Sequence, residues 1–149
     1  MLPLKKILCP TDFSEASYEA LKAANELALH FSAELCLVHV LSPDVQTSPD
    51  LAGSDLVLEE IEELDEKSLQ DVVKQRIPKE LHTRQIVVPG EAADEIIRMS
   101  EEQKADLIVI ATHGQTGCRR ILLGSVADKV VRLAPCPVLT IRAPHEQVR

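Results

Sequence analysis

The chain has 149 residues, of which 45% are hydrophobic and 27% charged, and its formal net charge is −8. This length suits one domain with a full core, and the composition is ordinary for a soluble globular protein. An acidic chain whose aromatic residues are Phe13, Tyr18 and Phe31 lacks the clustered cations and stacking surfaces of a general nucleic-acid binder.

The sequence also argues against a membrane span and a metal site. It contains no apolar run of the roughly 18 residues that a spanning helix needs, and its basic start is followed by no apolar region of signal length. The cysteines form neither a C-x-x-C pair nor a ligand cluster with the histidines, which favours reduced thiols. We therefore expect one cytoplasmic domain over residues 1–149, with no metal ligands of its own.

The first part of the chain predicts a strand, a helix and a second strand. Residues 7–9 form a short apolar run, and residues 15–31 follow a helical period with a small, alanine-rich face suited to packing on a sheet. Residues 35–40 predict a central strand because they are nearly all apolar. His39 interrupts this strand, and we expect a hydrogen-bonded core histidine there, with a functional one as the alternative.

The middle of the chain predicts a loop, two helices and a third strand. Residues 41–54 contain two prolines and a glycine and predict a loop, and residues 55–76 predict a long acidic helix. The acids of that helix are expected to form a solvated face rather than a partner surface. A strand at 83–88 and a helix at 91–103 follow, joined by a turn at Pro89 and Gly90.

The last part predicts a strand at 107–111, a loop with three glycines, a helix at 125–134, a strand at 138–141 and a polar tail. The run at 107–111 is wholly apolar, as in a strand that is buried on both faces. Strands that alternate with helices imply βαβ units, and so an α/β fold with a largely parallel sheet and helices on both faces.

The strongest functional signal is the passage from the strand at 107–111, through the glycine loop, to the helix that begins at Ser125. Glycine lets backbone N–H groups approach a phosphate, and a helix N-terminus supplies free donors and a positive dipole end. The Ser125 hydroxyl can cap the helix or donate to a phosphate oxygen. We hypothesise that this segment binds nucleotide phosphates; the alternative is that the glycines only make turns.

Two common phosphate-binding motifs are excluded. A P-loop requires lysine before its serine or threonine, and Gly124 stands before Ser125. The dinucleotide fingerprint requires G-x-G-x-x-G at the first strand-to-helix turn, and residues 9–14 contain no glycine.

The pattern Ala111-x2-Gly114-x9-Gly124-Ser125 resembles the G-x2-G-x9-G-[ST] motif of ATP-binding members of the universal stress protein family, with alanine at the first glycine. The blocks at 112–114 and 122–126 are similar as well, and the resemblance covers essentially the whole chain. It implies a Rossmann-like fold of the adenine nucleotide alpha hydrolase type: an open, five-stranded parallel sheet of order 3-2-1-4-5. It further implies bound ATP, ADP or AMP, Mg²⁺ held through the phosphates, and a homodimer through the last strand, Val138, Leu139, Thr140 and Ile141.

The same resemblance assigns the nucleotide site. The residues that it implies are Pro10, Thr11, Asp12, Val40, Gly90, Ala111, Thr112, His113, Gly114, Gly117, Arg120, Gly124, Ser125 and Val126. Asp12 is expected to face the adenosine, although it could instead cap the following helix. Gly90 is either a turn glycine or a wall of the adenine pocket. The loop glycines, Ser125 and the Val126 N–H are expected to hold the phosphates, and Arg120 could screen their charge.

The expected function is that of a nucleotide-dependent regulatory protein in the stress response. No nucleophile–base pair is visible, so no catalytic residue is assigned and binding is favoured over catalysis. One alternative is a slow ATPase that relies on His113 and Asp12. The other is a stress-related interaction module that binds no nucleotide, which Ala111 leaves open.

Overall fold

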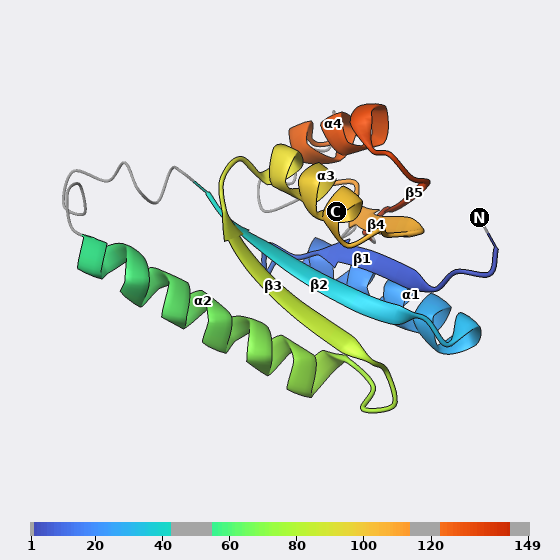
Figure 1. Cartoon of the computed structure of the whole chain (residues 1–149), viewed down its shortest axis with the longest axis horizontal. Helices are drawn as coiled ribbons and strands as arrows, with labels where there is room; N and C mark the ends of the chain where they lie inside the picture. The colour runs from blue at the N-terminus through green and yellow to red at the C-terminus, as the bar shows by residue number, and fades with distance from the viewer. Residues whose placement is uncertain (1, 43–54, 114–122, 144–149) are drawn as a thin grey trace, which may run out of the picture.

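The computed structural model describes residues 2–42, 55–113 and 123–143, in which strands and helices alternate (Figure 1). In chain order the elements are β1 (Lys6–Pro10), α1 (Glu15–Phe31), β2 (Glu34–Leu41), α2 (Asp55–Arg76), β3 (Thr83–Pro89), α3 (Ala92–Glu102), β4 (Leu107–Ala111), α4 (Ser125–Leu133) and β5 (Val138–Ile141). All pairings are parallel, and the strand order is β3-β2-β1-β4-β5. The expected α/β fold and its strand order are therefore confirmed.

Side chains that alternate along the central strands divide the core into two layers. Ile7 and Cys9 of β1 pack with α1 and α2 on one face of the sheet, whereas Leu8 packs with α3 and α4 on the other. β2 and β4 alternate in the same way, which is why β4 is apolar throughout and β2 is nearly so. Figure 1 shows the sheet between these two pairs of helices.

The helix α1 lies close to the sheet because its buried face is small. Ala20, Ala24 and Ala28 are fully buried on the side that faces β1 and β4. The helix begins after Ser14, whose Oγ accepts a hydrogen bond of 3.1 Å from the Ser17 N–H. The cap and the small face together fix where the turn after β1 leaves the sheet.

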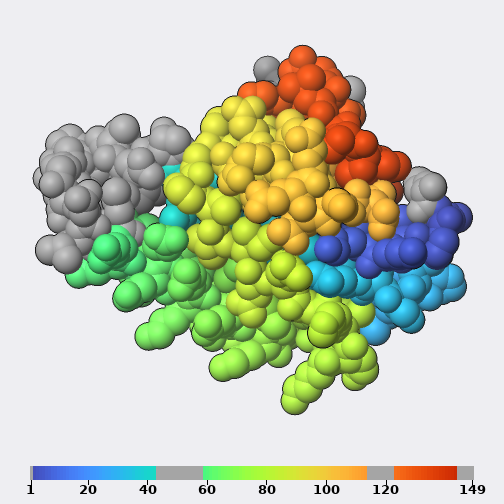
Figure 2. Space-filling model, viewed as in Figure 1, coloured from blue at the N-terminus to red at the C-terminus, as the bar shows by residue number. Residues whose placement is uncertain are grey.

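The helix α2 is anchored mainly through its C-terminal half. Leu69 and Val72 are buried in the layer of α1, whereas Leu64 is 62% exposed. Figure 2 shows side chains of α2 projecting from the molecule below the sheet. The acidic residues Glu59, Glu60, Glu63 and Glu66 are exposed, as expected of a solvated face.

The two outer strands differ in chemistry. β3 carries exposed polar side chains, and its Arg84 forms an ion pair of 3.1 Å with Glu34 of β2. β5 is wholly apolar except for Thr140, and Leu139 is 39% exposed. No helix in the described ranges combines the length and apolar content needed to cross a membrane.

The predicted bounds differ from the observed ones only at element ends. The strands predicted at 7–9, 35–40 and 83–88 extend to Lys6–Pro10, Glu34–Leu41 and Thr83–Pro89. The helix predicted at 91–103 is Ala92–Glu102, because the Glu91 side chain caps it by accepting from the N–H groups of Ala93 and Asp94. The helix predicted at 125–134 ends at Leu133.

Candidate functional site

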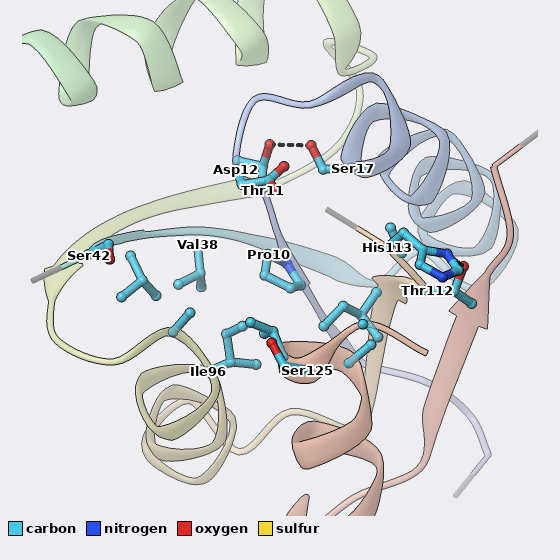
Figure 3. Close-up of a pocket in the computed structure, with 17 residues that line it drawn as sticks. Pro10, Thr11, Asp12, Ser17, Val38, Ser42, Ile96, Thr112, His113 and Ser125 are labelled. Carbon is cyan, nitrogen blue, oxygen red and sulfur yellow. Dashed lines mark hydrogen bonds between the residues drawn. The ribbon is translucent and has the colours of Figure 1, made fainter. Parts of the chain in front are cut away.

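A cavity of about 410 Å³ opens where β1 and β4 end side by side (Figure 3). After β1 the chain passes to α1 on one face of the sheet, and after β4 it passes to α4 on the other face. The two connections diverge, which leaves a crevice at the carboxyl ends of the strands, the usual ligand site of open α/β sheets.

The β1 side of the cavity is formed by Pro10, Thr11 and Asp12. The Thr11 N–H donates to the Val38 carbonyl at 2.8 Å, and the Thr11 hydroxyl lies 3.0 Å from that of Ser17, the contact dashed in Figure 3. Asp12 accepts from the Ser14 N–H at 3.0 Å and from the Ser14 hydroxyl. Asp12 therefore organises the start of α1 while lining the cavity.

The β4 side is closed by a short backbone hydrogen bond. The Gly124 N–H donates to the Thr112 carbonyl at 2.6 Å, and the Thr112 N–H donates to the Ile141 carbonyl of β5 at 2.9 Å. The Thr112 hydroxyl contacts His113 Nδ1 at 3.0 Å, and Figure 3 shows these two side chains together near the end of β5. These bonds tie the start of α4 to the end of β4.

The first turn of α4 opens onto the cavity. Gly124 is its N-cap residue, with φ −63° and ψ 163°, and glycine has no side chain with which to cap. The N–H groups of the first helical residues, Ser125, Val126 and Ala127, have no partner within the helix, and all three residues line the cavity. A Cβ atom at Gly124 would lie 3.2 Å from the Thr112 carbonyl oxygen. The arrangement joins free donors to the positive end of the helix dipole.

The opposite wall is apolar. Val38 and Val40 of β2, Ile96 of α3 and Ile110 of β4 surround it, and Ile96 is only 3% exposed. Such a wall suits a flat, uncharged ring better than a phosphate. Val38, Ile96 and Ser125, labelled in Figure 3, line the same cavity, so the apolar wall and the start of α4 border one space.

Most of the predicted site residues converge on this cavity. It is lined by Pro10, Thr11, Asp12, Val40, Ala111, Thr112, His113, Gly124, Ser125 and Val126. Gly90 is not among the lining residues; it has φ +142°, and its N–H donates to the Leu41 carbonyl at 3.0 Å, as a turn glycine does. Gly114, Gly117 and Arg120 lie outside the described residues.

Sequence reasoning missed Ser17, Val38, Ser42, Ala92, Ile96, Ile110 and Ala127, which also line the cavity. Val38 and Ile110 could have been found by counting back two positions from the predicted residues Val40 and Thr112, because alternate residues of a strand share a face. Ala92 and Ile96 carried no such signal, since only the packing of α3 across the sheet brings them to the site.

Charged side chains outside the cavity hold α4 against α3. Lys129 Nζ lies 2.7 Å from Asp94 and 3.4 Å from Glu91. The hydrogen bond from Lys129 lowers the pKa of Asp94, and the same bond raises the pKa of Lys129.

Within the described ranges, His, Cys, Asp and Glu side chains nowhere form a group of three that could hold a metal ion. Asp12 and His113 are the titratable side chains among the described lining residues.

Comparison with known proteins gives the chain its family. The family model of universal stress proteins matches residues 3–142. The chain is 39% identical over 146 residues to the universal stress protein MJ0531 of Methanocaldococcus jannaschii, covering 96% of this chain and 85% of that protein.

Solved structures agree with this match. The hypothetical protein MJ0577, from the same organism, has a TM-score of 0.84 and 28% identity, covering 96% of this chain and 99% of that one. A universal stress protein from Archaeoglobus fulgidus, solved in complex with dAMP, shares the fold with a TM-score of 0.65 and 24% identity over 94% of this chain and 98% of that one. Because the family match spans nearly the whole chain, the chain belongs to the universal stress protein family.

Proposed function

We propose that this chain binds an adenine nucleotide in the cavity between β1 and β4 and acts as a nucleotide-dependent regulatory protein. The observation that carries the proposal is the first turn of α4, whose N–H groups open onto the cavity behind an N-cap residue that has no side chain. Three N–H groups that have no partner within the helix, together with the positive dipole end, suit an anion, and phosphate is the anion that nucleotides present.

The phosphates are placed at this helix start. Ser125, Val126 and Ala127 would supply backbone donors, because the Gly124 N–H already donates to the Thr112 carbonyl, and the exposed Ser125 hydroxyl would add another. Gly114, Gly117 and Arg120 stay predicted phosphate contacts. Mg²⁺, where present, would be held by the nucleotide's phosphate oxygens and would neutralise part of their charge.

The nucleoside is placed between the apolar wall and the β1 side. Val38, Val40 and Ile96 would pack on the base, and the Val40 backbone, at the end of β2, would read its edge. Asp12 would face the sugar while it still holds Ser14. The dAMP complex of the A. fulgidus protein supports the class of ligand, since a chain of the same fold holds an adenine nucleotide.

A homodimer through β5 is part of the proposal. β5 is an outer strand of the sheet, and its residues Val138, Leu139, Thr140 and Ile141 present an apolar edge. Outer strands of this kind associate unless something covers them. A cytoplasmic location would match such a protein.

Calorimetric titration with MgATP, AMP and adenosine tests the site. We expect wild-type protein to bind both nucleotides, and Gly124→Arg to weaken ATP binding by more than about 100-fold, because its side chain enters the space that the phosphates need. Gln70→Arg is the matched control: it adds the same charge at an exposed residue of α2 and should leave binding unchanged.

Three outcomes would contradict parts of the proposal. If Gly124→Arg binds ATP as tightly as the wild type, the phosphates are not at α4. If wild-type protein binds neither nucleotide, the chain is an interaction module instead. If wild-type protein hydrolyses ATP faster than Gly124→Arg does, the site is catalytic as well as regulatory.

A further inference from the structure

The side chain of His39 lies between the cavity and α2. Its neighbours in the strand, Val38 and Val40, line the cavity, whereas His39 points to the other face of the sheet, because its ring contacts α2. Nδ1 lies 2.8 Å from the Thr11 carbonyl oxygen, and Nε2 lies 2.9 Å from Asp65 Oδ2. One ring thus joins the β1 side of the cavity to a helix that contributes none of the described lining residues.

Both partners of the ring are hydrogen-bond acceptors. A backbone carbonyl only accepts, and so does an ionised carboxylate, whereas a neutral imidazole has one N–H to donate. The ring therefore satisfies Thr11 and Asp65 together only as the imidazolium ion. When it loses a proton, one of the two contacts brings a nitrogen lone pair against an oxygen lone pair, and that contact must open.

The surroundings of the ring are acidic and apolar. From α2, Asp65 touches the ring, and Glu62 lies one turn earlier, half-buried. From the turn after β1, the Phe13 ring stacks at 4.5 Å between centroids. From β3, the register partner Val87 is apolar. The charged groups named among these described residues, Asp65 and Glu62, are thus acids, and the side chain of His39 is only 12% exposed, so water replaces a lost contact poorly.

We propose that His39 is a positioning residue for the nucleotide site: protonated, it clamps α2 to the Thr11 carbonyl and so fixes the segment that carries Asp12. Nucleotide affinity and the docking of α2 then rise together as pH falls, over the range in which histidine changes charge. Because binding linkage is reciprocal, nucleotide also favours the docked α2. The affinity part rests on the function proposed above; the clamp itself does not.

The clamp is tested first without nucleotide, by nitrogen-detected NMR of the His39 ring in the full chain. At about pH 6 both ring nitrogens should carry protons, and at about pH 8 loss of one should move the amide signals of Asp65 and Asp12. Asp65→Asn should abolish these linked movements. Glu62→Gln, which removes the same charge from the same helix without touching the ring, should retain them.

MgATP affinity then tests the coupling. Other groups add their own pH dependence to ATP binding, so the quantity compared is the ratio of Kd at about pH 8 to Kd at about pH 6 in each variant. This ratio should be about threefold to tenfold larger in wild type and Glu62→Gln than in His39→Gln and Asp65→Asn, the size of one hydrogen bond.

Several results would contradict the clamp or the proposed function. A ring that carries a single proton at about pH 6, or that titrates without moving the amides of Asp65 and Asp12, overturns the clamp. Equal ratios in Glu62→Gln and Asp65→Asn show that only general charge matters, which overturns it too. If wild-type protein binds no ATP, the proposed function fails while the NMR measurement still decides the clamp.

Discussion

Replacing Gly124 by serine should make the protein more stable and its nucleotide binding weaker at the same time. Gly124 is the N-cap residue of α4 and has φ −63°, which any residue can adopt. Serine at an N-cap accepts from the N–H groups two or three positions on, here those of Val126 or Ala127. If those groups hold phosphate, the new hydroxyl competes with the ligand for them.

The expected changes in folding stability and in nucleotide affinity have opposite signs. Serine in place of glycine at an N-cap adds a few tenths of a kcal/mol to the free energy of unfolding. The new Cβ lies 3.2 Å from the Thr112 carbonyl oxygen, which offsets part of this gain. Losing one N–H bond to a charged phosphate removes about 1.5–3 kcal/mol of binding, or roughly 10- to 100-fold in Kd.

Gly124→Ala is the matched control, because it adds the same Cβ but cannot cap. Alanine should be about 1 kcal/mol less stable than serine at this position, yet it should bind ATP more tightly than serine does. Urea denaturation measures the first quantity and calorimetric titration the second. If the serine variant binds ATP as well as the alanine variant, the N–H groups of α4 are not the phosphate donors and the reasoning is refuted.

Two further predictions concern burial and assembly. Burial raises the pKa of Cys9 to about 12, so its thiol should resist disulfide reagents in the folded protein. The free energy of unfolding should fall as pH rises above the ordinary thiol pKa of 9.0, because there only the unfolded thiol ionises. A Cys9→Ala variant with the same pH slope in urea denaturation would contradict this. Leu139→Lys should convert the proposed dimer to a monomer in sedimentation velocity while changing monomer stability by less than about 0.5 kcal/mol, since Leu139 is 39% exposed; a wild-type chain that sediments as a monomer would exclude this interface.

The local sequence pattern predicted the ends of an element correctly where residues next to that element set them. β4 has the predicted bounds because its apolar run is flanked by Asp106 and Thr112. The ends of β1 were missed because they are set from a distance. Lys6 and Pro10 belong to the strand through register with Glu34 and Val38 of β2, and one-strand periodicity contains no such information.

The candidate site also contains residues that local sequence predicts and residues that only distant packing brings there. The glycine spacing of β4–α4 carried its own signal, and the structure brings Gly124 and Ser125 to the cavity. His39 was expected to be hydrogen-bonded, which is confirmed, but Asp65 could not be named because it is 26 residues away on a separate helix. Ile96 was missed for a related reason, since its role comes from the packing of α3 rather than from any motif.

The unlike outer strands limit how large an assembly this fold can build. β3 displays polar side chains and the Arg84–Glu34 ion pair, which discourage another strand from adding there. β5 offers an apolar edge, and two copies that pair through their β5 edges would bury both edges. Assembly would therefore stop at the dimer and would not continue into a fibre.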